Sequence, residues 1–139
     1  MSVEENKKSL YRCMEEIWNK RDLSVIPEVI SPNFVMGDVK GLDGFEQAVK
    51  STLATTPDFH TTIDEVIGEG DTLMIRITNS GHYTGKAANI DISNKEYTLP
   101  VMLINRYKDG KCYESTSFAN ILPYMQQLGI PIPPEWGMG

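Results

Sequence analysis

The spacing of apolar residues changes once along this chain of 139 residues, and that change constrains the fold more than any other feature. Up to about residue 55 the apolar residues recur at helical spacing, as Leu10, Cys13 and Ile17 do. From Phe59 onward they alternate with polar residues, as in half-buried strands. Helices followed by a run of strands predict the α+β class, in which helices cover one face of an antiparallel sheet.

Three helices are expected in the first part of the chain. The first begins at a capping box formed by Ser2 and Glu5 and ends near Lys20. The second is short, follows Asp22 and is stopped by Pro32, because a residue that precedes proline avoids the helical conformation. The third helix comes after a short strand.

That short strand contains Phe34 and Met36, and the third helix starts at Gly41 and must end before Pro57. The rest of the chain predicts a four-stranded antiparallel meander, with strands over residues 59–67, 72–83, 97–107 and 112–119.

Turns and caps separate the later elements. Glu69-Gly70-Asp71 and Lys108-Asp109-Gly110-Lys111 are typical of tight turns between antiparallel strands. Asn120 is expected to cap a final short helix that ends at Gly129. Prolines then keep the C-terminal tail, residues 130–139, extended.

Length and composition predict one globular domain over residues 1–139. The net charge of −6 repels phosphate backbones, so no nucleic-acid partner is expected. No apolar run approaches the roughly 18 residues that cross a bilayer, and the N-terminus is charged from Glu4 onward, so we expect no membrane partner and a cytoplasmic location. The lone cysteines Cys13 and Cys112 predict buried thiols in a reducing cell.

A curved sheet wrapped around a long first helix leaves a conical cavity, which is the default ligand site of such a fold. Aromatic residues on the core-facing stripes are expected to fill or border it, and they are Tyr11, Trp18, Phe34, Phe45 and Phe118. The chain has no phosphate-binding loop, no dinucleotide fingerprint and no metal-ligand spacing, so we expect neither a cofactor nor a metal.

Short motifs span nearly the whole chain, and in order they are Glu15-Glu16-Ile17-Trp18-Asn19-Lys20, Gly41-Leu42-Asp43-Gly44-Phe45, Pro57-Asp58-Phe59, Gly70-Asp71, Gly81-His82-Tyr83-Thr84-Gly85, Arg106-Tyr107-Lys108-Asp109-Gly110-Lys111 and Gln126-Gln127-Leu128-Gly129. In this order and spacing the set resembles the SnoaL-like polyketide cyclases. The resemblance implies a cone of the nuclear transport factor two type, often dimeric through its sheet. It also implies the activity of the family's cyclases, which close a polyketide ring by an intramolecular aldol reaction without a cofactor.

The resemblance further implies an aspartate in the last strand as the acid/base, and this chain has Ser117 at that position. A second common aspartate corresponds to Asn120, the motif histidine to Tyr83, and a polar position in the preceding strand to Leu103. A serine alone does not remove an α-proton at neutral pH. Ser117 is therefore expected to line the pocket, buried beside Leu103 and Phe118, rather than to catalyse the aldol step.

Three residues remain as weak catalytic candidates. Asp58 is either a carboxylate at the mouth of the cone or the first residue of an Asx turn. His82 has the chemistry of a general base near neutral pH, but strand alternation points it away from the face of Tyr83, and both it and His60 are also interpreted as solvent-facing. Tyr83 either donates a hydrogen bond to a ligand carbonyl or lies at the rim with a hydrated hydroxyl.

The predicted pocket lining comprises Trp18, Phe34, Leu103, Asn105, Ser115, Ser117 and Asn120. Two functions remain open. One is a cofactor-free cyclase, isomerase or dehydratase acting on a small apolar carbonyl compound. The other is a non-catalytic module that binds a hydrophobic small molecule of polyketide-like or steroid-like character, or a dimeric scaffold. A perturbed carboxylate or histidine inside the cone favours the enzyme, whereas a lining without titratable groups favours the binding module.

A homodimer is also expected. The outer face of strand 72–83 carries Met74, Arg76 and Thr78, which are too apolar and too short for a freely solvated sheet. Pairing of two such faces would cover them.

Overall fold

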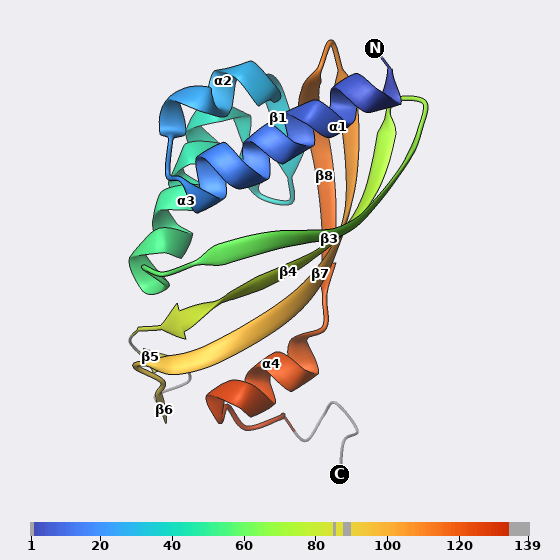
Figure 1. Cartoon of the computed structure of the whole chain (residues 1–139). Helices are drawn as coiled ribbons and strands as arrows, with labels where there is room; N and C mark the ends of the chain where they lie inside the picture. The colour runs from blue at the N-terminus through green and yellow to red at the C-terminus, as the bar shows by residue number, and fades with distance from the viewer. Residues whose placement is uncertain (1, 85, 88–89, 134–139) are drawn as a thin grey trace.

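The structure is a computed structural model that describes residues 2–84, 86–87 and 90–133. One six-stranded sheet runs through the molecule, and in spatial order its strands are β2 (Val39–Lys40), β1 (Ile30–Met36), β8 (Lys111–Ala119), β7 (Lys95–Lys108), β4 (Thr72–Tyr83) and β3 (His60–Glu69). The α-helices are α1 (Val3–Arg12), α2 (Ile26–Val29), α3 (Gly41–Thr55) and α4 (Ile121–Leu128). Figure 1 shows α1, α2 and α3 together at one end of the curved sheet and α4 by itself at the other end.

The four long strands confirm the meander that the alternation predicts. Leu73, Ile75 and Ile77 are buried on the concave face of β4, whereas Met74 and Arg76 between them are exposed on the outer face. Both predicted turns are present, and the β7–β8 turn has the two positive φ angles, at 109 and 110, of a tight two-residue hairpin. The α+β class predicted from the change of period is therefore correct.

The sheet is larger than the predicted meander, and it is not wholly antiparallel. Strand β1 pairs with β8 in parallel, and β2 extends the edge beyond β1. A separate two-stranded ladder, β5 (Lys86–Ala87) with β6 (Ile90–Asp91), lies between β4 and β7 in the sequence. Local alternation could not reveal the β1–β8 pairing, because its two strands lie about 80 residues apart in the sequence.

The second helix is shorter than predicted. A 3₁₀ turn, η2 (Leu23–Val25), runs directly into the four residues of α2, and the backbone is already extended at Ile30. Pro32 therefore lies inside β1 rather than at the end of a helix. One short strand was predicted between the second and third helices, and the structure has two there, β1 and β2.

The first helix changes its winding halfway. Beyond Arg12 it continues as a π-helix, η1 (Cys13–Asn19), which ends with the amide of Lys20 donating to the carbonyl of Glu15 five residues earlier, at 2.9 Å. Short π-helical segments are concentrated at functional sites. In this chain the segment carries buried side chains toward the sheet and places Asn19 against the edge strand β3.

Asn19 fastens the end of η1 to β3. Its side-chain amide donates to the carbonyl of Thr61 at 2.9 Å, and its side-chain oxygen accepts from the amide of Thr61 at the same distance. The guanidinium of Arg21 donates to the carbonyls of Asn19 and Phe59, each at 2.8 Å. These bonds satisfy backbone groups that an edge strand otherwise leaves unpaired.

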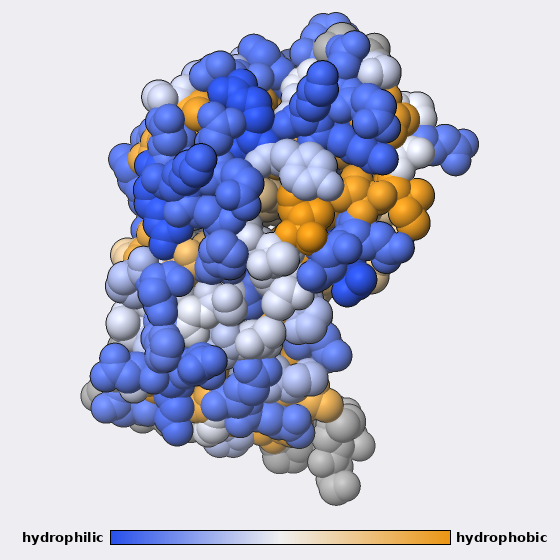
Figure 2. All heavy atoms as spheres, in the orientation of Figure 1, coloured by the Kyte–Doolittle hydropathy of each residue, from blue (hydrophilic) through white to orange (hydrophobic). Residues whose placement is uncertain are grey.

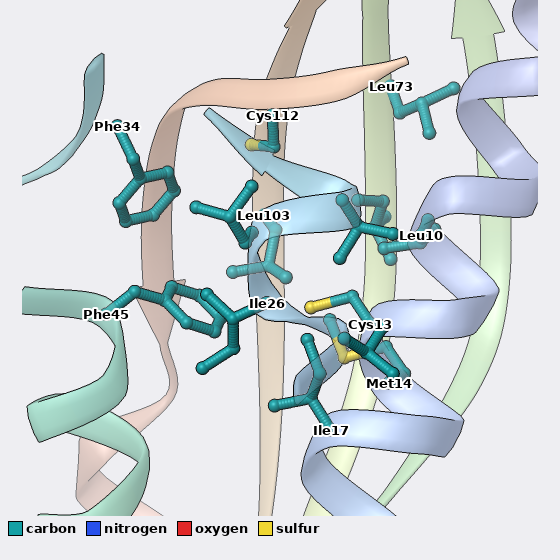
Figure 3. Close-up of a cluster of buried hydrophobic side chains, with 14 of the residues drawn as sticks. Leu10, Cys13, Met14, Ile17, Ile26, Phe34, Phe45, Leu73, Leu103 and Cys112 are labelled. Carbon is teal, nitrogen blue, oxygen red and sulfur yellow. The ribbon is translucent and has the colours of Figure 1, made fainter. Parts of the chain in front are cut away.

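Two hydrophobic clusters lie against the concave face. The larger one joins η1, α2 and α3 to the sheet, and Figure 3 shows Leu10, Met14 and Ile17 pointing from the first helix toward Leu103 of the sheet. The smaller one lies under α4 and contains Ile92, Tyr97 and Leu128.

Some predicted details of packing are wrong. Tyr11 and Phe118 were expected to face the core, but they are 48% and 69% exposed. Phe118 belongs to the outward-facing set of β8 and lies opposite Met102 on the outer face. Residues 134–139 of the predicted tail lie outside the described residues. None of the described helices is both long and apolar enough to span a membrane.

Replacing Asn19 tests the fastening of η1 to β3. Asn19→Ala leaves the amide and the carbonyl of Thr61 without their partner, and we expect a loss of about 1–3 kcal/mol in the free energy of unfolding, measured by denaturant titration. Asn33→Ala, at an exposed position of β1, is the control and should change stability by less than about 0.5 kcal/mol. Equal losses in the two variants would contradict the fastening role.

Candidate functional site

A cavity of about 320 Å³ lies between the helices and the concave face of the sheet. Its walls come from η1, α3 and β1 on one side and from β3, β4, β7 and β8 on the other. Figure 2 shows the face that contains α1 and α4, with a recess at the middle of the molecule and apolar side chains gathered along one side of it. The volume is at the lower end of the range for small-molecule sites.

Aromatic side chains form one wall of the cavity. The rings of Trp18 and Phe59 lie 5.2 Å apart between centroids, and those of Phe34 and Phe45 lie 5.3 Å apart in an edge-to-face arrangement. Trp18 also contacts Phe45 edge-on at 6.3 Å. Aromatic pairs at these distances stabilise each other, so this wall is largely preformed.

A buried network of neutral hydrogen bonds lies on the sheet side of the cavity. The hydroxyl of Ser115 donates to the side-chain oxygen of Asn105 at 2.6 Å, and the amide of Asn105 donates to the hydroxyl of Tyr107 at 3.2 Å. Asn105 and Ser115 are direct partners in the β7–β8 register, which explains why their side chains meet. Burial raises the pKa of Tyr107, so its hydroxyl stays protonated at neutral pH.

A second polar spot in the cavity consists of Thr61 and Asn79. They are direct partners in the β3–β4 register, and both line the cavity. The hydroxyl oxygen of Thr61 and the side-chain oxygen of Asn79 are buried and have no hydrogen-bond partner among the described residues. Each is therefore available to a bound molecule.

Both cysteines line the cavity as neutral thiols. Burial raises the pKa of Cys13 to about 12, with a further contribution from the nearby Cys112. Burial also raises the pKa of Cys112 to about 12. A reactive cysteine needs a lowered pKa, so neither thiol has the properties of a nucleophile.

The described residues that line the cavity include no aspartate, glutamate, histidine, lysine or arginine. Its titratable members are Cys13, Cys112 and Tyr107, and burial favours the neutral form of each. General acid/base catalysis near pH 7 requires a group whose pKa lies near 7, and this lining supplies none. Among the described residues, no group of three metal-ligating side chains comes together either.

Six of the seven predicted lining residues border the cavity: Trp18, Phe34, Leu103, Asn105, Ser115 and Ser117. Ser117 lies at the open rim and is exposed rather than buried, and its predicted neighbour Phe118 faces the opposite side of the sheet. Asn120 does not line the cavity. The chain leaves β8 at this residue and turns into α4, so its side chain is exposed beyond the cavity, and it makes no side-chain cap.

The weak catalytic candidates lie outside the cavity. Tyr83 packs against the small cluster under α4, and His60 is exposed. Asp58 and His82 come together on the surface, where one carboxylate oxygen accepts from the backbone amide of His82 at 2.8 Å and the other lies 2.6 Å from its ring Nδ1. The other ring nitrogen lies 3.5 Å from a carboxylate oxygen of Glu96.

Close packing holds this surface pair in place. A Cβ atom at Gly81 would collide with the side chain of Thr56 and lie 3.0 Å from a carboxylate oxygen of Asp58. The hydrogen bond to Asp58 raises the pKa of His82. The bonds from the backbone and ring of His82 lower the pKa of Asp58. Neither residue lines the cavity, and the pair links the segment before β3 to β4.

Sequence reasoning missed Thr61, Asn79 and Tyr107. Alternation was a usable signal for two of them, because Asn79 lies two residues beyond Ile77 and Tyr107 two residues beyond Asn105 on the same faces. No local pattern indicated that Thr61 lies opposite Asn79, since that depends on the register of β3.

Comparisons with known proteins agree with this architecture. A family model described as SnoaL-like polyketide cyclase matches residues 8–128. TsrD from Streptomyces laurentii has a TM-score of 0.84 at 20% identity, over 94% of this chain and 99% of that chain. A SnoaL-like polyketide cyclase from Agrobacterium tumefaciens has a TM-score of 0.80 at 13% identity, over 93% and 100%. IdmH from Streptomyces antibioticus has a TM-score of 0.78 at 20% identity, over 90% and 99%. No curated protein matches the chain in sequence.

The Asp58–His82 pair predicts a specific pH dependence. Because the folded-state pKa of His82 is raised, its contribution to stability is complete below the unfolded value of about 6.5 and is lost as the pH rises through the folded value. Asp58→Asn should bring the pKa of His82 down toward about 6.5 in an NMR titration, and the stability advantage of the native chain over this variant should shrink across that window. Glu96→Gln is the control and should move the pKa of His82 less, because its charge contributes least.

The contribution of Asp58 to stability depends on pH in the opposite direction, because folding lowers its pKa. Its contribution is present above the unfolded value of about 3.9 and is lost as the pH falls through the folded value. A pKa of His82 that is unchanged in Asp58→Asn would contradict the assigned cause.

Proposed function

The chain belongs to the SnoaL-like polyketide cyclase family, and we propose that it binds an uncharged, largely apolar small molecule in its cavity without acting as an acid/base cyclase. The observation behind this proposal is the composition of the cavity lining. Its described residues form aromatic and aliphatic walls with a few neutral polar groups, and none of them is charged at neutral pH. A charged ligand buried there would lose its hydration without gaining an ionic partner.

The position of the family's acid/base aspartate supports the same proposal. By the motif alignment that position is Ser117, at the rim of the cavity. The titratable groups of the described lining are two thiols and Tyr107, whose raised pKa values oppose the formation of an anion.

One observation favours an enzyme as the second candidate. The Ser115–Asn105–Tyr107 network resembles the preorganised neutral donors that stabilise a developing oxyanion. A cyclase, isomerase or dehydratase also needs a base opposite such donors, and no described lining residue fits that role. A binding function therefore accounts for the observed lining without requiring a catalytic base.

A matched pair of fluorescent probes tests the binding proposal. N-phenyl-1-naphthylamine is neutral, and 8-anilino-1-naphthalenesulfonate has the same skeleton with a negative charge. We expect the neutral probe to bind at least about tenfold more tightly, because the sulfonate finds no cation in the cavity. Fluorescence titration measures both affinities.

A blocking variant locates the bound probe. Ser117→Trp places an indole at the rim and should weaken binding of the neutral probe about tenfold or more, whereas Thr116→Trp, on the outer face of the same strand, should leave it unchanged. Preference for the charged probe, or equal effects of the two variants, would overturn the proposal.

We also propose a homodimer that pairs the outer faces of the sheet. Apolar side chains are exposed on neighbouring strands of that face, and they are Ile67, Met74, Met102 and Phe118. Met102 lies opposite Phe118 on β8, and Met74 lies opposite Ile67 on β3 and Ile104 on β7, so the apolar rows of this face span four neighbouring strands. Contiguous exposed apolar surface of this kind marks an interaction site.

Light scattering tests the dimer. The native chain should scatter as a particle of twice 15.6 kDa at micromolar concentration. Phe118→Glu should shift it to the monomer mass, because pairing would bury two like charges opposite Met102, which offers no ionic partner. Ser51→Glu, at an exposed position of α3 and away from the outer face of the sheet, is the control and should leave the mass unchanged. A native chain that scatters as a particle of 15.6 kDa would contradict the proposed dimer.

A further inference from the structure

The cavity contains polar atoms that the protein itself does not satisfy. Three buried side-chain oxygens among the described residues have no hydrogen-bond partner, and two of them, on Thr61 and Asn79, line the cavity. A buried polar atom left unpaired costs more than an ordinary hydrogen bond returns. Native structures keep such atoms where a ligand or an ordered water meets them.

The two oxygens form a single polar spot. Thr61 is only 2% exposed and lies opposite Asn79 in the sheet. Its backbone is already fully bonded by Asn19, which leaves its hydroxyl as the one unpaired group of the residue. The neighbouring lining is apolar and includes Trp18 and Phe59.

The chemistry of the pair selects a hydroxyl group. The side-chain oxygen of Asn79 is an acceptor only, so its partner must donate a hydrogen. The hydroxyl of Thr61 is able to donate, so its partner can be an acceptor. A single hydroxyl on a ligand satisfies both at once, whereas a ketone would satisfy Thr61 alone.

The opposite end of the cavity offers a donor. The hydroxyl of Tyr107 accepts from Asn105, and none of the hydrogen bonds between described residues uses its own proton. The oxygen of Asn105 is already occupied by Ser115. The hydroxyl of Tyr107 is therefore available to donate to an acceptor such as a carbonyl oxygen.

Apolar residues separate the two polar ends. Asn105 lies opposite Leu73 on β4, six residues from Asn79, which is about 20 Å measured along the curved strand. The rows between them on the concave face are formed by Ile75 with Leu103 and Ile77 with Val101. On β8, Ser117 at the rim lies opposite Leu103 and is a polar group beside these middle rows. On the concave face of β4 and β7, however, the polar side chains are at the two ends of the cavity, with apolar side chains between them.

We infer that the cavity takes an elongated, uncharged ligand with a hydroxyl group at the Thr61–Asn79 end and a carbonyl group at the Tyr107 end. The inference rests on the proposed function, since it requires that the cavity bind an apolar molecule at all. It adds the class of ligand, a hydroxy-ketone with an apolar middle, and the two places that recognise its ends.

Displacement of N-phenyl-1-naphthylamine tests the ligand class. The competitors are ω-hydroxy-2-alkanones of graded chain length, each compared with the 2-alkanone and the 1-alkanol of the same length. The hydroxy-ketone should bind about 2- to 10-fold more tightly than either parent, the worth of one neutral hydrogen bond, and its affinity should peak at one chain length.

Two variants assign the ends. Asn79→Leu should remove the preference for the hydroxy-ketone over the ketone and keep the preference over the alcohol, and Tyr107→Phe should do the reverse. Ser80→Leu and Tyr113→Phe, outside the described lining, are the matched controls and should keep both preferences. A selective change of this kind does not arise from general loss of stability.

The outcomes separate the two proposals. If the naphthylamine does not bind, the proposed function fails. If it binds but the hydroxy-ketones displace it no better than their parents, the inference is overturned and an ordered water satisfies Thr61 and Asn79. Loss of both preferences in either single variant would also overturn the assignment of the two ends.

Discussion

The concave face of the sheet is longer than the N-terminal helices can cover, and the rest of the structure depends on how the uncovered part is filled. An apolar sheet face must be shielded from water along its length. Here α1, α2 and α3 shield one end, and α4 shields the other. Leu99 packs against both hydrophobic clusters and so lies where the two coverings approach each other. The cavity is the space that neither covering fills.

Charged side chains lie on the surface of the molecule, whereas neutral polar side chains line the concave side of the curved sheet. The hydrogen-bonded pair of Asp58 and His82 lies on the surface, and Arg76 pairs with Asp64 and Glu65 on the outer face. On the concave side the polar groups are amides, hydroxyls and protonated thiols. In a low-dielectric interior a neutral donor keeps its hydrogen and costs less to bury than an ion. Recognition in this cavity therefore depends on hydrogen-bond geometry and shape, and not on ionic attraction.

The sequence predicts the parts of the fold that local pattern controls. Alternation located β4 at its observed bounds, and Gly129 ends α4 in the left-handed conformation as predicted. The β1–β8 pairing was missed because a parallel ladder joins segments far apart in the sequence, and apolar residues near Ile30 suit a helix and a strand equally.

The same limit applies to the site. The concave positions of β7 and β8 were predicted from alternation, since Asn105 shares one face of its strand with Leu103, and Ser115 shares one face of its strand with Ser117. Asn120 was placed in the lining by motif alignment, but the chain turns away from the sheet at that residue. The meeting of Asp58 with His82 and of Thr61 with Asn79 depends on tertiary register, which composition and spacing do not encode.

Asn19 explains how the strand beside the cavity can be stable and still hold an unpaired hydroxyl. An edge strand whose backbone is unpaired invites water or another chain. Asn19 pairs with both backbone groups of Thr61 from outside the sheet, so the backbone there is as well bonded as in a central strand. The side chain then projects from a fixed backbone into the cavity, and its orientation does not depend on a ligand. A poorly packed region leaves backbone and side chain unsatisfied together. Here the backbone is satisfied and only the cavity-facing atoms are not, which is the arrangement expected of a preformed recognition site.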